Sequence, residues 1–166
     1  IAQRGPGAWK GLYTVVSLLG FALIVWGFAQ ARLQPVVLWA TPTWTRHLAA
    51  LLMLVAFVLL AAAYVPRNAF KARLHHPMVL SVKVWALAHL LANNTLADAL
   101  LFGGFLVWAV VSFRAARGRD RAGQVVYPAG TAMGTLLTLV VGVVAYAAMA
   151  FWAHGAWLGV RPFGGA

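Results

Sequence analysis

Long runs of apolar residues, separated by short polar connections, form the main pattern of this chain. Each of five runs has about the length that a helix needs to cross a bilayer, which is roughly 20 residues. A helix satisfies its own backbone hydrogen bonds in lipid, so every run is predicted to be helical. The predicted spans are residues 9–31, 44–65, 77–92, 96–113 and 130–157. The pattern therefore predicts an all-α polytopic transmembrane helical bundle, with residues 1–166 forming a single domain.

The composition of the chain excludes a soluble domain. Apolar residues make up 63% of the sequence and charged residues 9%, which is more apolar surface than one soluble core of this size can bury. The formal net charge is +11, but the basic residues lie mostly in the connections between spans. That placement indicates membrane topology, with the lipid bilayer as the partner, and does not favour nucleic acid. The absence of cysteine excludes disulfides and thiolate metal sites.

Local signals mark where the third and fourth helices begin and end. Pro77 suits the first position of the third helix, where a missing amide hydrogen costs nothing. Asn93 is expected to end that helix. Thr95 and Asp98 have the spacing of a capping box, which would open the fourth helix directly afterwards. These signals predict two helices joined by a tight turn.

Small residues recur at every fourth position near the start of the last span. They are Gly130, Gly134, Thr138 and Gly142. Small side chains at this spacing allow another helix to approach closely. The face is therefore predicted to be a packing surface, and it is the expected contact with a larger membrane protein complex if the chain is a subunit.

The distribution of basic residues predicts the orientation in the membrane. One side of the predicted topology has nine Lys and Arg residues, and the other has three. Loops rich in Lys and Arg stay in the cytoplasm, so residues 66–76 and 114–128 are predicted to be cytoplasmic. The nine are Arg4, Lys10, Arg67, Lys71, Arg73, Arg114, Arg117, Arg119 and Arg121, and the three are Arg32, Arg46 and Arg161.

Ionisable side chains at membrane depth are costly and are therefore the first candidates for function. The topology places His75 and His76 at the cytoplasmic end, and His47, His89 and His154 near the outer end. An axial pair for a b-type haem needs two neutral imidazoles at one depth on separate helices. His47 with His89 meets that condition. His76 has no equal-depth partner on another helix of this chain, because His75 is its immediate neighbour.

The same residues also have structural explanations. Histidines at helix ends often cap the helix or reach the headgroups, and this applies above all to His75 and His154. Lys83 fits that explanation poorly, since it lies about two turns from either end of its helix and shares a face with His76. We expect the Lys83 amine to meet a haem propionate, a carbonyl group or a wet cavity in the bundle.

Asp98 and Asn93 are the residues expected to support His89. Asp98 is either only the acid of the capping box or the acceptor of a proton from His89, which would fix the tautomer of the imidazole. Asn93 ends the same helix. Other catalytic arrangements are missing: the two acids fall on opposite sides of the membrane, and neither a metalloprotease helix motif nor a phosphate-binding loop is present.

Several short stretches together resemble the NnrU family. They are GAWKGLY at 7–13, RHL at 46–48, AAAY at 61–64, HPM at 76–78, KVWALAHLLAN at 83–93 and LLFGG at 100–104. NnrU proteins are bacterial inner-membrane proteins associated with denitrification and nitric oxide metabolism. They are similar to the plant 15-cis-zeta-carotene isomerase, which uses a histidine-ligated b-type haem. The resemblance therefore implies an inner-membrane location and a haem b cofactor.

The resemblance also bears on the ligands of that haem. The family pattern has a sixth helix upstream of Gly7, with a His-Ser pair near its cytoplasmic end. If the isomerase scheme applies, His76 is the first candidate ligand and its partner sits on that helix. His47 and His89 form the alternative pair, and Lys83 is a further candidate contact of the cofactor.

Three functions remain open at this stage. The first is an NnrU-type haem-binding membrane protein linked to nitrogen-oxide metabolism. The second is a haem-dependent cis-trans isomerase of a carotenoid or other isoprenoid, whose substrate enters from the bilayer. The third is a non-catalytic accessory subunit of a larger membrane complex.

Overall fold

The computed structural model describes residues 5–164, and within this range the regular structure is helical. Four helices have the length and apolar character to cross a membrane, and a fifth apolar helix is shorter. The all-α prediction is thus confirmed. The helices are α1 (Gly5–Ala31), α2 (Thr43–Tyr64), α3 (Ala69–Leu74), α4 (Pro77–Ala92), α5 (Leu96–Ala122), α6 (Ala132–Ala148), the π-helix η1 (Met149–Ala153) and α7 (His154–Leu158).

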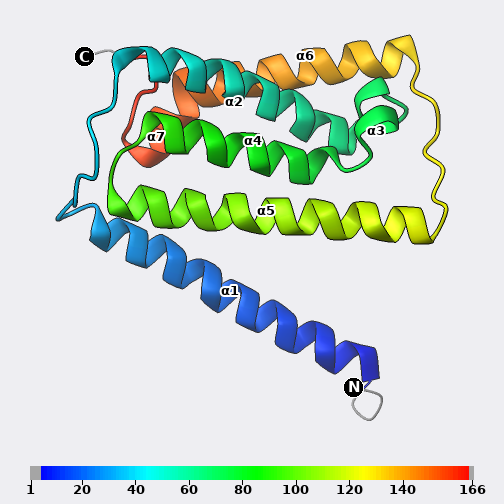
Figure 1. Ribbon diagram of the computed structural model, residues 1–166, viewed down its shortest axis with the longest axis horizontal. Coiled ribbons are helices and arrows are strands. Elements are labelled where there is room, and N and C mark those ends of the chain that lie inside the picture. Colours follow the sequence, from blue (N-terminus) through cyan, green and yellow to red (C-terminus); the bar gives the residue numbers. More distant parts are fainter. Residues whose placement is uncertain (1–4, 165–166) are drawn as a thin grey trace.

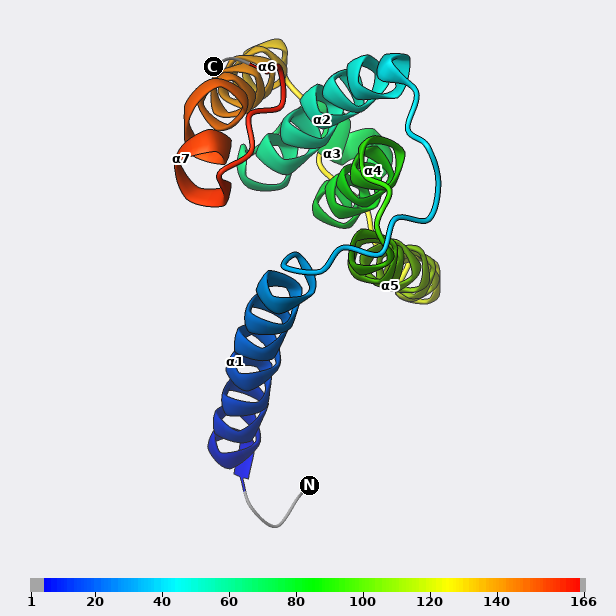
Figure 2. The same cartoon turned by 90° about the vertical axis from the view of Figure 1, so that its left-hand side faces the viewer.

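Helices α2, α4, α5 and α6 lie alongside one another and form the bundle (Figure 1). Helix α2 packs against α4 on one side and α6 on the other, and α4 also packs against α5. Helix α1 diverges from the bundle, and it contacts α5 (Figure 2). That contact includes the rings of Phe28 and Phe102, with centroids 6.5 Å apart.

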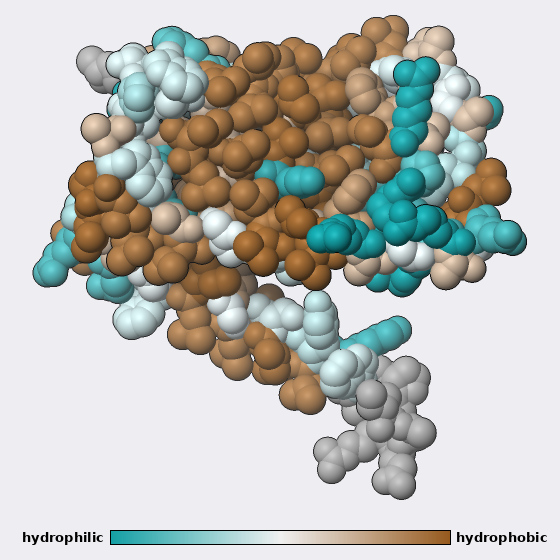
Figure 3. All heavy atoms as spheres, in the orientation of Figure 1, coloured by the Kyte–Doolittle hydropathy of each residue, from teal (hydrophilic) through white to brown (hydrophobic). Residues whose placement is uncertain are grey.

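Small side chains make up most of the buried interior. Ala62, Ala86, Ala88 and Ala109 are fully buried, which lets the backbones of neighbouring helices approach closely. Large apolar side chains instead cover the outside, and Figure 3 shows them over the middle of the bundle, with hydrophilic side chains gathered toward its ends. This distribution matches a bilayer as the surrounding solvent.

The ladder of small residues on the last span packs within the chain. A Cβ atom added at Gly142 would lie 2.7 Å from the Cα atom of Val58 on α2, and one added at Gly134 would lie 2.5 Å from the carbonyl oxygen of Arg67. Gly130 is equally tight against Ala69, and Thr138 is fully buried. The predicted close approach is therefore present. α2 and the start of α3 already cover this face, so it offers no free surface for the suggested contact with a larger complex.

Two predicted boundaries need correction. Helix α5 continues to Ala122, so the basic segment from Arg114 onward is helical, and the connection to α6 begins only at Gly123. Arginine is a good helix former, so charge alone does not end a helix. The predicted fifth span is divided into α6, η1 and α7. Arg4, one of the nine residues on the basic-rich side, lies outside the described residues.

A short helix, α3, interrupts the connection between α2 and α4. Asn68 organises this connection and is 1% exposed. Its amide group donates to the carbonyl oxygens of Ala62 at 2.9 Å and Val65 at 2.6 Å, and its carbonyl oxygen accepts from the Lys71 amide at 2.8 Å. One side chain thus closes the end of α2 and caps the start of α3.

Candidate functional site

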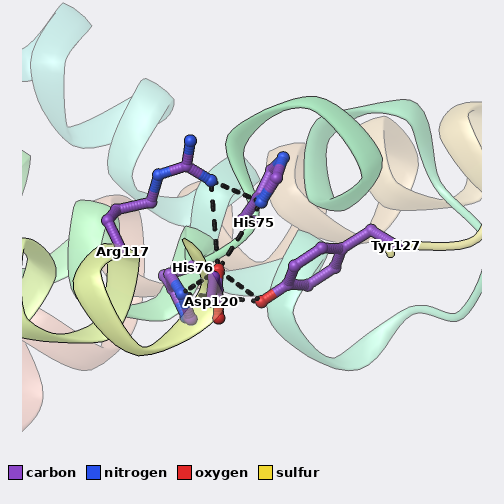
Figure 4. A network of polar contacts seen from close by, with 5 residues as sticks. All are labelled: His75, His76, Arg117, Asp120 and Tyr127. Atoms are coloured by element: carbon purple, nitrogen blue, oxygen red, sulfur yellow. Dashed lines mark hydrogen bonds and ion pairs between the residues drawn. The ribbon is translucent and has the colours of Figure 1, made fainter. Parts of the chain in front are cut away.

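Polar side chains gather at both ends of the bundle. We call them the α3 end, which also holds the C-terminal turns of α5, and the α7 end, which holds the turn between α4 and α5. At the α3 end, Asp120 is the centre of a five-residue network with His75, His76, Arg117 and Tyr127 (Figure 4). The side chain of Asp120 is only 12% exposed.

One carboxylate oxygen of Asp120, Oδ2, receives most of these contacts. His76 Nε2 lies 2.8 Å away, and the hydroxyl of Tyr127 donates from 3.1 Å. His75 Nδ1 lies at 3.6 Å and Arg117 Nη1 at 3.9 Å. Because a carboxylate only accepts, His76 carries its proton on Nε2, and its Nδ1 has no partner among the described residues.

The backbone between α3 and α4 aims both histidines at α5. His75 has a φ of 69° and a ψ of −51°, and the amide of His76 donates to the carbonyl of Leu74 at 2.9 Å. This is a γ-turn of the strained positive-φ form. A non-glycine residue held in such a conformation is typical of functional or switch regions. Pro77 then starts α4 with His76 as the N-cap residue, as predicted.

Two neighbours of Asp120 show how the network is arranged. Arg117 lies against Nδ1 of His75 and, because a guanidinium can only donate, this nitrogen accepts from it. Tyr127 lies in the connection after α5, and its pKa is raised above 10 by burial and by its hydrogen bond to the negative Asp120. Asp120 therefore joins α5, the α3–α4 turn and the α5–α6 connection.

A cleft of about 280 Å³ opens at the α7 end, between α2, α4 and the C-terminal segment. We call it the α7-end cleft. Its walls include the small residues Ala49 and Ala50 of α2 and Ala88 and Ala92 of α4. Six polar residues also line it: Arg46, His89, Asn93, Tyr146, His154 and Arg161.

The two histidines of the α7-end cleft are held in the same way. His89 Nδ1 lies 2.9 Å from the carbonyl oxygen of Trp85, and His154 Nδ1 lies 2.6 Å from that of Val160. A carbonyl can only accept, so both imidazoles are protonated on Nδ1 when neutral. Nε2 of each ring makes no hydrogen bond to the described residues, and it is free to accept a proton or bind a metal.

The π-helix accounts for the presence of His154 in the cleft. Gly142, Tyr146, Ala150 and His154 follow one another at every fourth position. In an α-helix, four residues advance about 40° beyond one turn, so such a series drifts around the axis. The π-helical turn Met149–Ala153 is wider and offsets this drift, so Tyr146, Ala150 and His154 all line the cleft.

The structure separates the other predicted site residues. His47 is exposed on α2 and does not line the α7-end cleft, so it is not brought together with His89. Lys83 is half-buried, with its Nζ atom 5.9 Å from the centre of the Phe113 ring. The amine of Lys83 makes no hydrogen bond to the described residues. Its role at a cofactor stays a prediction.

Of the two residues expected to support His89, Asn93 contacts it and Asp98 does not. Asp98 forms the capping box with Thr95, whose hydroxyl donates to it at 2.5 Å. It does not accept from His89, because the Trp85 carbonyl takes that proton. Asn93 lines the cleft and donates to the carbonyl of His89 at 2.9 Å. Within residues 5–164, no group of three His, Asp or Glu side chains is placed to hold a metal ion.

Sequence reasoning missed two functional candidates. Asp120 was overlooked among the arginines of a supposed loop, although a lone acid in a basic segment needs a partner. His154 was given a structural explanation, and its four-residue spacing from Gly142 through Tyr146 and Ala150 does not by itself place it on the face that meets α2, because only the π-helical turn keeps this series on one side.

These features define a polytopic helical membrane protein with an apolar middle and polar clusters at its two ends. Within that class the chain belongs to the NnrU protein family, whose sequence profile matches residues 1–162. The match confirms the resemblance seen in the sequence. No curated protein and no solved structure matches the chain.

Proposed function

We propose that this chain is the helical membrane domain of an NnrU-type protein of the bacterial inner membrane, and that it binds a b-type haem and acts in nitric oxide metabolism during denitrification. Family membership supports the proposal at the level of the protein class. The haem and the nitrogen-oxide role go further: the haem is proposed from the hydrogen bonding of the histidines, and the nitrogen-oxide role from what the family resemblance implies.

The supporting observation is shared by His76, His89 and His154. Each has one ring nitrogen held by an acceptor, which is Asp120, the Trp85 carbonyl and the Val160 carbonyl respectively. The second ring nitrogen of each has no partner among the described residues. Such an outer hydrogen bond fixes the tautomer and the ring direction of histidines that bind metals.

The residues present also fit the other needs of a haem. A haem requires apolar walls, imidazole ligands and cations for its propionates, and these residue types occur together in this chain. When bound, its iron supplies a centre for binding diatomic molecules or for electron transfer. The protein contributes ring orientation, access and exclusion of water.

An absorption spectrum of the full-length protein, purified after expression with added haem, tests the proposal. We expect a Soret band, and a shift of that band when nitric oxide is added to the reduced protein. If the purified protein contains no haem, the proposal fails, and the accessory-subunit function becomes the better explanation. If haem is bound but does not respond to nitric oxide, a polyene isomerisation assay is the next test.

A further inference from the structure

We infer that the amine of Lys83 binds the phosphate group of a phospholipid from the leaflet at the α3 end, and that the acyl chains of this lipid lie along α4 and α5. The site is one for a lipid and does not depend on haem, so it goes beyond the proposed function. Lys83 is a half-buried cation on an apolar helix, and a charge in that position needs a counter-charge.

Neither acid of the chain neutralises Lys83. The sequence contains only two, Asp98 and Asp120. Asp98 lies at the α7 end and forms the capping box with Thr95. Asp120 is surrounded by the four partners drawn in Figure 4. Within residues 5–164 the Lys83 amine has a contact with an aromatic ring but no ion pair, so its anion has to come from outside the chain.

The ring of Phe113 shows where the Lys83 amine points. Nζ lies 5.9 Å from the centre of this ring, which is itself 6.2 Å from the centre of the His76 ring. His76 directly precedes α4, and Phe113 is directly followed by the exposed Arg114, where the basic part of α5 begins. Helical side chains lean toward the N-terminus of their helix, which for α4 is the α3 end. The amine therefore reaches toward the level where α5 changes from apolar to basic, and lipid phosphates lie at such a level.

Apolar side chains continue from Lys83 toward the middle of the bundle. Leu87 lies four residues after Lys83, on the same face of α4, and is 42% exposed. On α5, Leu106 and Val110 share a face with Phe113, and all three are half-buried. These side chains offer a partly open apolar surface below the amine. A phospholipid combines an anion with apolar chains, so one molecule fits both the cation and this surface.

Titration of phosphatidylglycerol into the delipidated full-length protein in a zwitterionic detergent, followed by native mass spectrometry, tests the site. We expect Lys83→Met to lower the affinity for this lipid by about fivefold or more, since one cation at lipid phosphates contributes about that factor. Lys83→Arg keeps the charge and should keep the affinity. Lys10→Met is the matched control, because Lys10 is an exposed lysine on α1, and it should change the affinity much less. Dioleoylglycerol, which has acyl chains but no phosphate, should bind equally to the wild type and to Lys83→Met. Circular dichroism checks that each variant is helical.

The possible outcomes separate the lipid site from its alternatives and from the proposed function. An unchanged affinity in Lys83→Met, or an equal loss in Lys83→Met and Lys10→Met, would overturn the inference. Displacement of the lipid by inorganic phosphate would identify free phosphate as the ligand and refute a lipid site. If Lys83→Met loses haem but keeps its affinity for phosphatidylglycerol, the amine serves the haem propionates, and the inference is wrong while the proposed function stands. If the wild-type protein lacks haem but its lipid binding depends on Lys83, the proposed function fails and the lipid site stands.

Discussion

His76 Nε2 lies 2.8 Å from Asp120 Oδ2 and thereby joins the residue before α4 to the last turn of α5. The same oxygen accepts from Tyr127, which lies beyond the end of α5. Three segments that are separate in sequence thus meet at one carboxylate. The charge of Asp120 should therefore be measurable through its partners, and Tyr127 is the most accessible reporter.

The phenol of Tyr127 should ionise at a higher pH than an ordinary tyrosine. Burial and the hydrogen bond to negative Asp120 both favour the neutral phenol, so its pKa is raised above 10. In Asp120→Asn the charge is removed but the shape is kept, and the midpoint should move back toward 10. The ultraviolet titration of each protein, minus that of its Tyr127→Phe counterpart, isolates this residue. Equal midpoints with and without the Asp120 charge would contradict the network.

The raised pKa of Tyr127 also determines how the stability of the fold changes with pH. The folded protein holds the Tyr127 proton more tightly than the unfolded chain does. The contribution to stability is therefore complete below a pH of about 10, and it is lost as the pH rises through the raised pKa. Thermal unfolding across this range should show the loss in the wild-type protein and a weaker one in Tyr127→Phe.

Replacing Gly142 by alanine should destabilise the bundle. A Cβ atom there would lie 2.7 Å from Val58 Cα, so α2 and α6 would have to separate. Overpacking of this kind costs about 1–3 kcal/mol. Gly104→Ala is the matched control, because a Cβ atom at Gly104 meets nothing within 4 Å. Alanine there should be neutral or stabilising by up to roughly 1 kcal/mol, since glycine weakens a helix interior.

Unfolding in mixed detergent micelles, followed by circular dichroism, measures both glycine variants. The expected order of stability places Gly104→Ala at or above the wild type and Gly142→Ala below it. Equal stability of the two variants would mean that α2 and α6 do not pack as described.

Features decided by neighbouring residues could be predicted from the sequence. The apolar runs predicted the four long apolar helical spans and the shorter apolar helix, and Pro77 and the Thr95–Asp98 capping box predicted helix starts that agree with the structure. Each of these depends on contacts within a few residues. The short helix α3 was missed because its cap, Asn68, lies in a basic segment that was interpreted only as a cytoplasmic loop.

The sites could not be predicted in the same way, because they depend on contacts across the bundle. His89 and His154 are 65 positions apart, and they share a cleft only because the π-helix keeps His154 on the side that faces α2. Asp120 reaches His76 because α5 continues as a helix past the end of its apolar part. Neither helix length nor helix register follows from local composition alone.

The orientation of the bundle is the last prediction, and the absence of cysteine makes it simple to test. Val126, in the α5–α6 connection, is 89% exposed, and Leu33, between α1 and α2, is 74% exposed. The two connections lie at opposite ends of the bundle (Figure 1). The excess of basic residues at the α3 end predicts that this end is cytoplasmic. With the chain in the inner membrane that we propose, a membrane-impermeant maleimide should therefore label Leu33→Cys from the periplasmic side of intact cells, and Val126→Cys only after that membrane is opened. The reverse labelling would place the α3 end and its Asp120 network outside, and would show that charge bias does not determine the topology of this chain.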